Sequence, residues 1–182
     1  ALYLDIETTG QSARDGQVTV VGLYGHGRMQ SLVRGETLTE DRLREALEQT
    51  DLLVTFFGSV FDIPYLQTAF PRVDFAKPHF DLCFAARRLG LQGGLKWIER
   101  ELQIYREAAI EGLDGWDAVR LWHQWRGGDE RALDLLLRYN AADARNLEPL
   151  AELLFHQMVD RYGPPSIGSC ERPSSTSDAV IS

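Results

Sequence analysis

The first third of the chain alternates short apolar runs with polar turns, a pattern typical of β-strands. The sequence Gly25-His26-Gly27 is a strong turn signal, so the runs on either side of it are predicted to form a hairpin. Buried strands of this kind are short and rich in β-branched residues. The predicted strands are residues 2–6, 17–24, 28–33 and 51–57.

Helical spacing of apolar residues dominates the rest of the chain. In the first predicted helix, residues 39–49, Leu43 and Leu47 share one side and charged residues the other. Strands first and then strand–helix alternation predict an α/β fold, a mixed sheet flanked by helices. Further helices are predicted at residues 60–70, 81–89, 95–102, 116–125 and 129–161.

The composition changes near the C-terminus. From residue 163 onward the chain is rich in Gly, Pro, Ser and Thr, with few large apolar residues. Such a segment cannot bury a core. We therefore expect one folded domain over residues 1–162. Residues 163–182 are expected to be a disordered tail, or a linker to a further domain or partner.

Charge and cysteine content narrow the classes of function. The 182 residues carry 27 acidic and 19 basic side chains, a formal charge of −8, which argues against nucleic-acid binding through a large basic surface. Cys83 and Cys170 are the only cysteines, which favours a reducing compartment. No apolar run approaches the roughly 18 residues of a membrane span, and no signal-peptide pattern is present. We expect a cytoplasmic protein without a membrane span.

The first candidate for chemistry is the pair Asp5 and Glu7 in the first predicted strand. Two residues apart, they share one face of a strand, and Leu4 and Ile6 face the core on the other side. Neighbouring acids repel each other, so they need a cation or an exposed edge strand. Either a bound cation or an exposed edge strand would account for the pair. Gly10, shortly after the pair, suits a turn with unusual φ.

Two further acids lie at positions where α/β proteins carry their sites. Asp62 lies near a helix start just after a strand, where open sheets place ligands, or where an acid simply favours the helix dipole. Tyr139 and Asp143 share a helix face, and Asp143 heads a stripe of leucines. A core-facing Asp is uncommon, unless Arg138 or Arg145 pairs with it.

Together these residues give four carboxylates in the order D-x-E, D, D. Oxygen ligands without His or Cys select hard divalent ions, Mg²⁺ or Mn²⁺. Two such ions about 4 Å apart would clamp the attacking and leaving oxygens of a phosphodiester. The pattern therefore favours a two-metal phosphodiesterase.

These residues resemble the motifs of the DEDD (DnaQ-like) 3′–5′ exonucleases of the ribonuclease H-like fold. The run Leu-Asp-Ile-Glu-Thr-Thr-Gly at residues 4–10 resembles the first motif, and Phe-Asp-Ile-Pro-Tyr-Leu at residues 61–66 the second. Tyr139-x-x-x-Asp143 resembles the third motif in its tyrosine form, DEDDy; the histidine form would need His where this chain has Arg138.

Finer features resemble the YprB-like ribonuclease H-like domain proteins. They are Asp-Leu-Leu-Val-Thr-Phe at residues 51–56, and His-Phe-Asp-Leu at residues 79–82 followed by Arg-Arg-Leu at residues 87–89. The likeness spans about residues 2–155 and implies a sheet of about five strands. One departure stands out: the second motif commonly carries Asn-Gly before its Phe-Asp pair, and this chain has Phe57-Gly58.

The resemblance implies that Asp5, Glu7, Asp62 and Asp143 hold two metal ions, with Asp5 bridging them. Tyr139 would orient the attacking water, and a 5′-mononucleotide would leave from a single-stranded DNA or RNA 3′ end. The residues implied to contact the terminal nucleotide are Thr8, Gly10 and Phe61, although core packing is the favoured role of Phe61. Two alternatives are a non-catalytic binding module on a nuclease fold and an internally cutting ribonuclease H.

Other chemistry-bearing side chains are expected to be structural. Asp81 is interpreted as a helix cap, and Lys96 as an ordinary surface charge, as are Arg87 and Arg88. The tryptophans that recur on one predicted helix, Trp116, Trp122 and Trp125, are expected to pack against the core or a partner.

Overall fold

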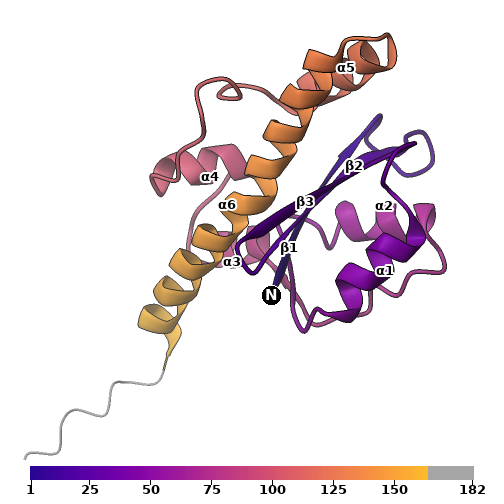
Figure 1. The fold of residues 1–182 in the computed structure, drawn as a ribbon. Helices are drawn as coiled ribbons and strands as arrows, with labels where there is room; N and C mark the ends of the chain where they lie inside the picture. Colours follow the sequence, from indigo (N-terminus) through magenta and orange to yellow (C-terminus); the bar gives the residue numbers. More distant parts are fainter. Residues whose placement is uncertain (164–182) are drawn as a thin grey trace, which may run out of the picture.

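The computed structural model describes residues 1–163, so the predicted tail lies outside the described residues from residue 164 onward. The described part of the chain begins with the strands of the hairpin region, and its last element is one long helix (Figure 1). The strands are β1 (Leu2–Thr8), β2 (Val18–Gly25), β3 (Arg28–Val33), β4 (Leu53–Thr55) and β5 (His79–Asp81). The helices are α1 (Glu40–Glu48), α2 (Asp62–Ala69), α3 (Leu82–Arg88), α4 (Leu95–Glu101), α5 (Gly115–Arg126) and α6 (Glu130–Tyr162).

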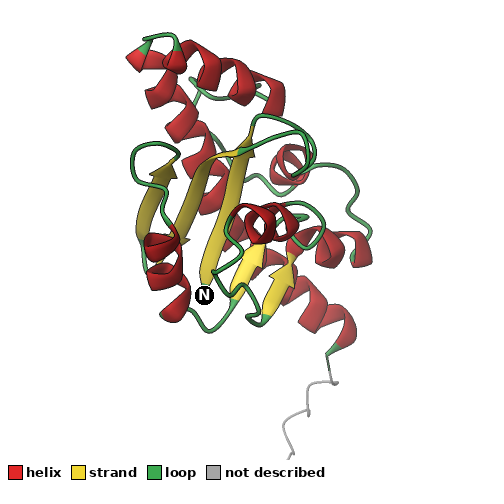
Figure 2. Ribbon diagram, turned by 90° about the vertical axis from the view of Figure 1, so that its right-hand side faces the viewer, coloured by secondary structure: helices red, strands yellow, loops and turns green. Residues whose placement is uncertain are grey.

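The five strands form one mixed sheet in the order β3-β2-β1-β4-β5. The first three strands pair antiparallel, and β4 and β5 continue the sheet parallel to β1. Figure 2 shows the three long strands together and the two short ones at one side. The predicted α/β fold with a mixed five-stranded sheet is thus confirmed, and β1 lies inside the sheet. The edge-strand explanation for its acids is therefore wrong.

Helices cover both faces of the sheet, which explains why side chains on both sides of its central strands are buried. Leu4 and Ile6 of β1 belong to the core beneath α1 and α2, together with Leu43 and Leu66 of those helices. Tyr3, on the opposite face, packs in the core formed by α3, α4 and α6. In Figure 1, α6 crosses the molecule on the side of the sheet away from α1 and α2. Within residues 1–163, no helix has the length and apolar character needed to cross a membrane.

The structure shortens one predicted strand and adds another. The strand predicted at residues 51–57 is paired only over β4. Beyond its C-terminal end, Phe57 has a φ of 65° and turns the chain away from the sheet. Gly58 then lies against Thr55, where an added Cβ would meet the threonine Oγ1 at 2.3 Å. The three residues of β5 are too few to show strand alternation in the sequence.

Candidate active site

β1 carries two carboxylates on the face of the sheet that α6 covers. Asp5 is half-buried and Glu7 is 6% exposed, and they alternate with the core residues Leu4 and Ile6. The register between β1 and β2 shifts between Glu7 and Thr8. Irregularities of this kind are frequent beside active sites, where they change the direction of a side chain.

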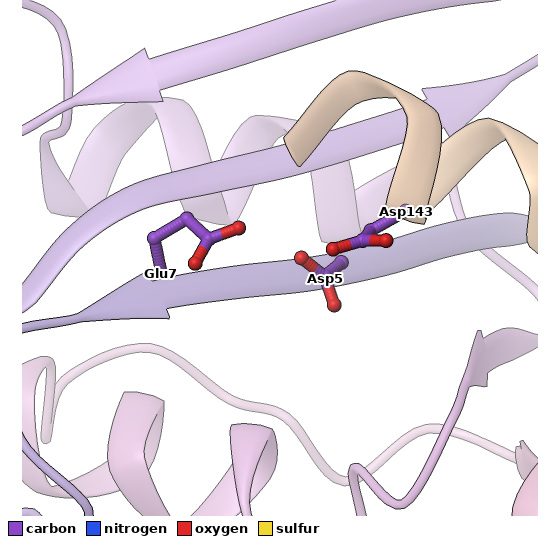
Figure 3. Close-up of side chains that lie close together, drawn as sticks. All are labelled: Asp5, Glu7 and Asp143. Atoms are coloured by element: carbon purple, nitrogen blue, oxygen red, sulfur yellow. The ribbon is translucent and has the colours of Figure 1, made fainter. Parts of the chain in front are cut away.

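Asp143 of α6 meets this pair from the facing helix. It is 6% exposed and heads the buried stripe that continues through Leu147, Leu150 and Leu154. Asp5, Glu7 and Asp143 each offer a carboxylate oxygen within 4.8 Å of the others. Figure 3 shows the three side chains converging, two from β1 and one from α6. Residues 138 positions apart in sequence thus form one acidic cluster.

Asp62, the first residue of α2, lines the same cavity but is not a member of that cluster. It is 5% exposed, and its Oδ1 accepts a hydrogen bond of 3.1 Å from the backbone N–H of Ile6. This bond fixes α2 against the strand between Asp5 and Glu7. The structure therefore brings all four predicted carboxylates to one cavity, with three of them in close contact.

Asn140, one turn before Asp143 on α6, holds Asp5 in place. Its Nδ2 donates a hydrogen bond of 2.9 Å to Asp5 Oδ2, and the residue is completely buried. Gly22 of β2, which pairs with Asp5 across the ladder, makes room for this contact. A Cβ on Gly22 would lie 2.4 Å from Asn140 Oδ1. A larger residue at position 22 is therefore incompatible with Asn140 in this position.

A buried ionic network supports Asp143. Arg106, with its side chain 7% exposed, forms an ion pair with Asp143 and hydrogen bonds of 2.6 and 2.7 Å with the Glu99 carboxylate. Asn146 donates a further hydrogen bond of 3.0 Å to Glu99. The predicted alternative, that Arg138 or Arg145 pairs with Asp143, is wrong. Arg138 contacts Glu107 and Asp134 on the surface instead.

Tyr139 lies in the same cavity, 3% exposed, and has a basic partner. Lys96 of α4 donates a hydrogen bond to the Tyr139 hydroxyl, and its ammonium lies 4.4 Å from the centre of the ring. The expectation that Lys96 is an ordinary surface charge is wrong. Periodicity could not reveal this, because α4 is short and Lys96 reaches the site only through its long stem.

Burial and mutual repulsion raise the pKa values of the carboxylates. Desolvation raises the pKa of Asp5 and of Glu7 well above the usual range, and nearby Asp143 raises both further. Desolvation raises the pKa of Asp62 to about 7, against opposing backbone hydrogen bonds. Burial also raises the pKa of Asp143, although Arg106 and Lys96 act in the opposite direction. The cluster therefore holds protons readily unless a cation is present.

The donor set fits a divalent cation. Within the described residues, Glu7 Oε1 is buried without a hydrogen-bond partner. A buried carboxylate oxygen of this kind needs a proton or a cation. Because the cluster offers only oxygen atoms, a hard ion such as Mg²⁺ or Mn²⁺ suits it best. Asp5, Glu7 and Asp143 are the residues that could hold such an ion.

The carboxylates lie in a cavity of about 400 Å³ that also contains the residues expected to contact substrate. Thr8 Oγ1 donates a hydrogen bond of 2.7 Å to the Gly10 carbonyl, so both belong to one turn at the cavity wall. The expectation of an unusual φ at Gly10 is wrong, because its φ lies outside the left-handed region. Its carbonyl also accepts a hydrogen bond of 2.8 Å from the Tyr65 hydroxyl. Phe61 also lines the cavity and packs against Tyr65 at a ring distance of 5.2 Å.

Two exposed aromatic side chains line this cavity, and one of them, Trp116, is not packed in the core. Trp116, at the start of α5, is 61% exposed and lines the cavity, whereas Trp122 on the same helix is buried. Phe57, the residue that departs from the resembled motif, also lines the cavity and is 36% exposed. Exposed aromatic side chains next to a cavity are suited to contact a ligand.

Comparisons with solved structures agree with this fold. Brucella melitensis NrnC bound to pGG matches with a TM-score of 0.65 at 21% identity, covering 89% of this chain and 74% of NrnC. NrnC with bound Mg²⁺ matches with a TM-score of 0.62 at 21% identity, covering 89% of this chain and 75% of NrnC. Escherichia coli RNase D, an exoribonuclease involved in structured RNA processing, matches at 0.61 and 18% identity, covering 87% of this chain and 40% of RNase D.

At these identities the structural likeness shows a shared fold. One of the proteins that share this fold, RNase D, is an exoribonuclease. Among curated proteins, no sequence matches this chain significantly. The family comparison is direct: the profile of the RNase H superfamily matches residues 2–155, from the start of β1 to the last third of α6. The chain therefore belongs to the RNase H superfamily.

Proposed function

We propose that this protein is a metal-dependent 3′–5′ exonuclease that acts on single-stranded DNA or RNA ends and releases 5′-mononucleotides. The observation that carries the proposal is the cluster of Asp5, Glu7 and Asp143, whose oxygens lie within 4.8 Å of one another beside Asp62 and Tyr139. Membership of the RNase H superfamily supports it, as do NrnC bound to pGG and RNase D among the structural neighbours.

The finer assignment to the DEDDy type rests on Tyr139 and the four carboxylates, and the likeness to YprB-like proteins on the motifs around them. We further propose that the enzyme works in the cytoplasm, because the chain has only two cysteines, far apart in sequence, and disulfide frameworks are typical of oxidising compartments.

Each residue of the site has a role in the proposed reaction. Asp5, Glu7, Asp62 and Asp143 would hold two Mg²⁺ or Mn²⁺ ions. When bound, such ions lower the pKa of an attacking water and neutralise the charge on the leaving 3′ oxygen. The Tyr139 hydroxyl, fixed by Lys96, orients the attacking water by hydrogen bonding. Thr8, Gly10 and Phe61 contact the terminal nucleotide from the cavity wall.

The test is hydrolysis of 5′-labelled single-stranded DNA and RNA oligonucleotides in Mg²⁺ or Mn²⁺. The labelled strands are separated by size, and the released unlabelled nucleotides are identified by chromatography. We expect a ladder that shortens from the 3′ end and free 5′-mononucleotides. Asp5→Asn and Asp143→Asn should each lower the rate by more than about 100-fold, because a charged ligand of the catalytic metal is lost. Asp160→Asn is the matched control, since Asp160 is an exposed acid on the same helix as Asp143.

The alternatives give different products. A circular single strand has no end, so its cleavage would indicate an internally cutting nuclease and contradict the exonuclease. Binding without hydrolysis of DNA or RNA in either metal would indicate a binding module. Hydrolysis that persists unchanged in Asp5→Asn and Asp143→Asn would place the activity elsewhere.

A further inference from the structure

Two exposed aromatic rings lie side by side, one of them lining the cavity, and have no role in the proposed chemistry. Phe57 follows β4 and lines the cavity with the carboxylates, at 36% exposure. Phe84 of α3 is 46% exposed, and the centres of the two rings are 6.4 Å apart. Together they extend an apolar surface from the cavity onto the outside of the protein.

A cation lies over both rings. The guanidinium of Arg87, also on α3, is 5.8 Å from the centre of the Phe57 ring and 5.5 Å from that of Phe84. Within residues 1–163 Arg87 forms no ion pair, so its charge is free to meet an anion. A guanidinium that stacks on a ring lining the cavity is a suitable group to contact a phosphate.

The backbone holds Phe57 in its position at a cost. A φ of 65° is unfavourable for a bulky side chain, and such outliers persist only where the surrounding structure enforces them. Asp81 supplies that support: its Oδ1 accepts a hydrogen bond of 2.8 Å from the Phe57 N–H, and its Oδ2 accepts one of 3.0 Å from the Ser59 N–H. The same carboxylate caps α3, the helix that carries Phe84 and Arg87.

We propose that Phe57, Phe84 and Arg87 form an aromatic platform on which an unpaired base of the substrate stacks, while Arg87 contacts a neighbouring phosphate. The inference rests on the proposed function and adds how that site grips a single strand. Flat rings beside a cation match a base and its phosphate, a combination that recurs in single-strand binding sites. A purely apolar protein partner would leave the Arg87 charge without an anion, which makes a nucleic-acid base the better occupant.

The test uses 5′-fluorescein-labelled oligothymidylates of ten residues, with single abasic sites placed in turn at each of the four positions nearest the 3′ end. Affinity is measured by fluorescence anisotropy in Ca²⁺, and gel electrophoresis of the same samples verifies that the strand stays intact. In the wild type, one abasic position should weaken binding by roughly 5- to 100-fold, the range that base–aromatic stacking supports.

Phe57→Asn is the informative variant, because Asn tolerates the left-handed backbone and removes the ring. It should bind the intact strand about as weakly as the wild type binds the strand whose abasic site weakens binding most. In the variant, an abasic site at that same position should have no further effect on affinity. Phe57→Tyr keeps a ring and should restore the base dependence. Phe155→Ala is the control, since Phe155 is exposed on α6 and does not line the cavity.

Arg87→Gln has a separate signature. Losing one phosphate contact should reduce the slope of log affinity against log salt concentration by about 0.7, as expected for a single strand. An unchanged slope would remove Arg87 from the platform.

The outcomes separate this inference from the proposed function. Three results would each overturn the platform. One is an unchanged affinity of Phe57→Asn for the intact strand, and another is an abasic site that weakens binding equally in this variant and in the wild type. The third is a wild type that binds no oligonucleotide. Base-dependent binding without hydrolysis in Mg²⁺ or Mn²⁺ would support the platform and overturn only the nuclease.

Discussion

Arg106 is a buried cation between two buried acids, Glu99 and Asp143, and Asp143 is one of the three clustered carboxylates. A buried arginine of this kind stabilises a fold only while its partners are in place, because removing one member leaves an uncompensated charge. Its position has a second consequence for the site. By pairing with Asp143 from outside the cluster, Arg106 limits the direction in which that carboxylate turns.

Replacing Arg106 by Met should lower the free energy of unfolding by about 3 to 5 kcal/mol, the usual cost of breaking a buried ion pair. Urea denaturation at neutral pH measures the change. Glu99→Gln in the same chain should recover part of the loss, because one of the two unpaired negative charges is then gone. Arg138→Met is the control, since the Arg138 pairs lie on the surface and should matter far less. Equal costs for Arg106→Met and Arg138→Met would contradict the assigned role.

The packing of β2 against α6 determines how Asp5 is held. Gly22 lies opposite Asp5 in the ladder, and Asn140 of α6 fills the space above it and bonds to Asp5. The three residues act as a unit: because Gly22 of β2 has no side chain, Asn140 of α6 can reach Asp5 of β1 and donate a hydrogen bond to it. The unit therefore predicts that substitutions at Gly22 and Asn140 have the same consequence for the site.

Gly22→Ala should displace Asn140, destabilise the fold by about 1 to 3 kcal/mol through overcrowding, and lower nuclease activity roughly 10- to 100-fold through loss of the support to Asp5. Asn140→Ala should lower activity by a similar factor. The double variant should be little worse in activity than either single one, because both changes remove the same contact. Losses that multiply in the double variant would show that Gly22 and Asn140 act independently.

The elements that the sequence predicted well are those with enough residues to show a period. The long helix α6 and the strands β1 to β3 repeat their apolar positions several times, and three of the four carboxylates lie on β1 or α6. Asp62 begins the short helix α2 instead. The strand β5 has only three residues, so periodicity could not indicate it. Arg106 lies in the irregular segment between α4 and α5, where no pattern relates it to Asp143. Its role depends on tertiary contacts that one sequence does not display.

The formal charge of −8 has a different meaning once the fold is known. Four of the acids face one cavity, and two divalent cations would add four positive charges, which brings the balance to −4. The acidity of the chain is thus in part the acidity of its site. It opposes tight binding to long duplexes, which depends on many lysines and arginines. It is compatible with a cavity that holds one strand end when metal is present, and strong binding of oligonucleotides in EDTA would contradict this.

The same four acids couple stability to pH and metal. Their pKa values are raised in the folded protein, that of Asp62 to about 7, so without metal the folded state binds more protons than the unfolded state. The resulting stabilisation is complete below the ordinary carboxyl pKa of about 4 and is lost as the pH rises toward neutrality. A divalent cation replaces those protons, so it should stabilise the protein much more at pH 8 than at pH 5.

Thermal unfolding in Mn²⁺ and in EDTA at these two pH values measures the effect. With Mn²⁺ at 100 times its dissociation constant, about 2.7 kcal/mol is gained, which corresponds to a rise of roughly 5 to 10 °C in Tm at pH 8. Glu7→Gln should raise the Tm in EDTA at pH 8, because one repelling charge is removed without breaking an ion pair among the described residues, and should reduce the Mn²⁺ effect. A Mn²⁺ effect as large at pH 5 as at pH 8 would mean that the ion binds away from these carboxylates.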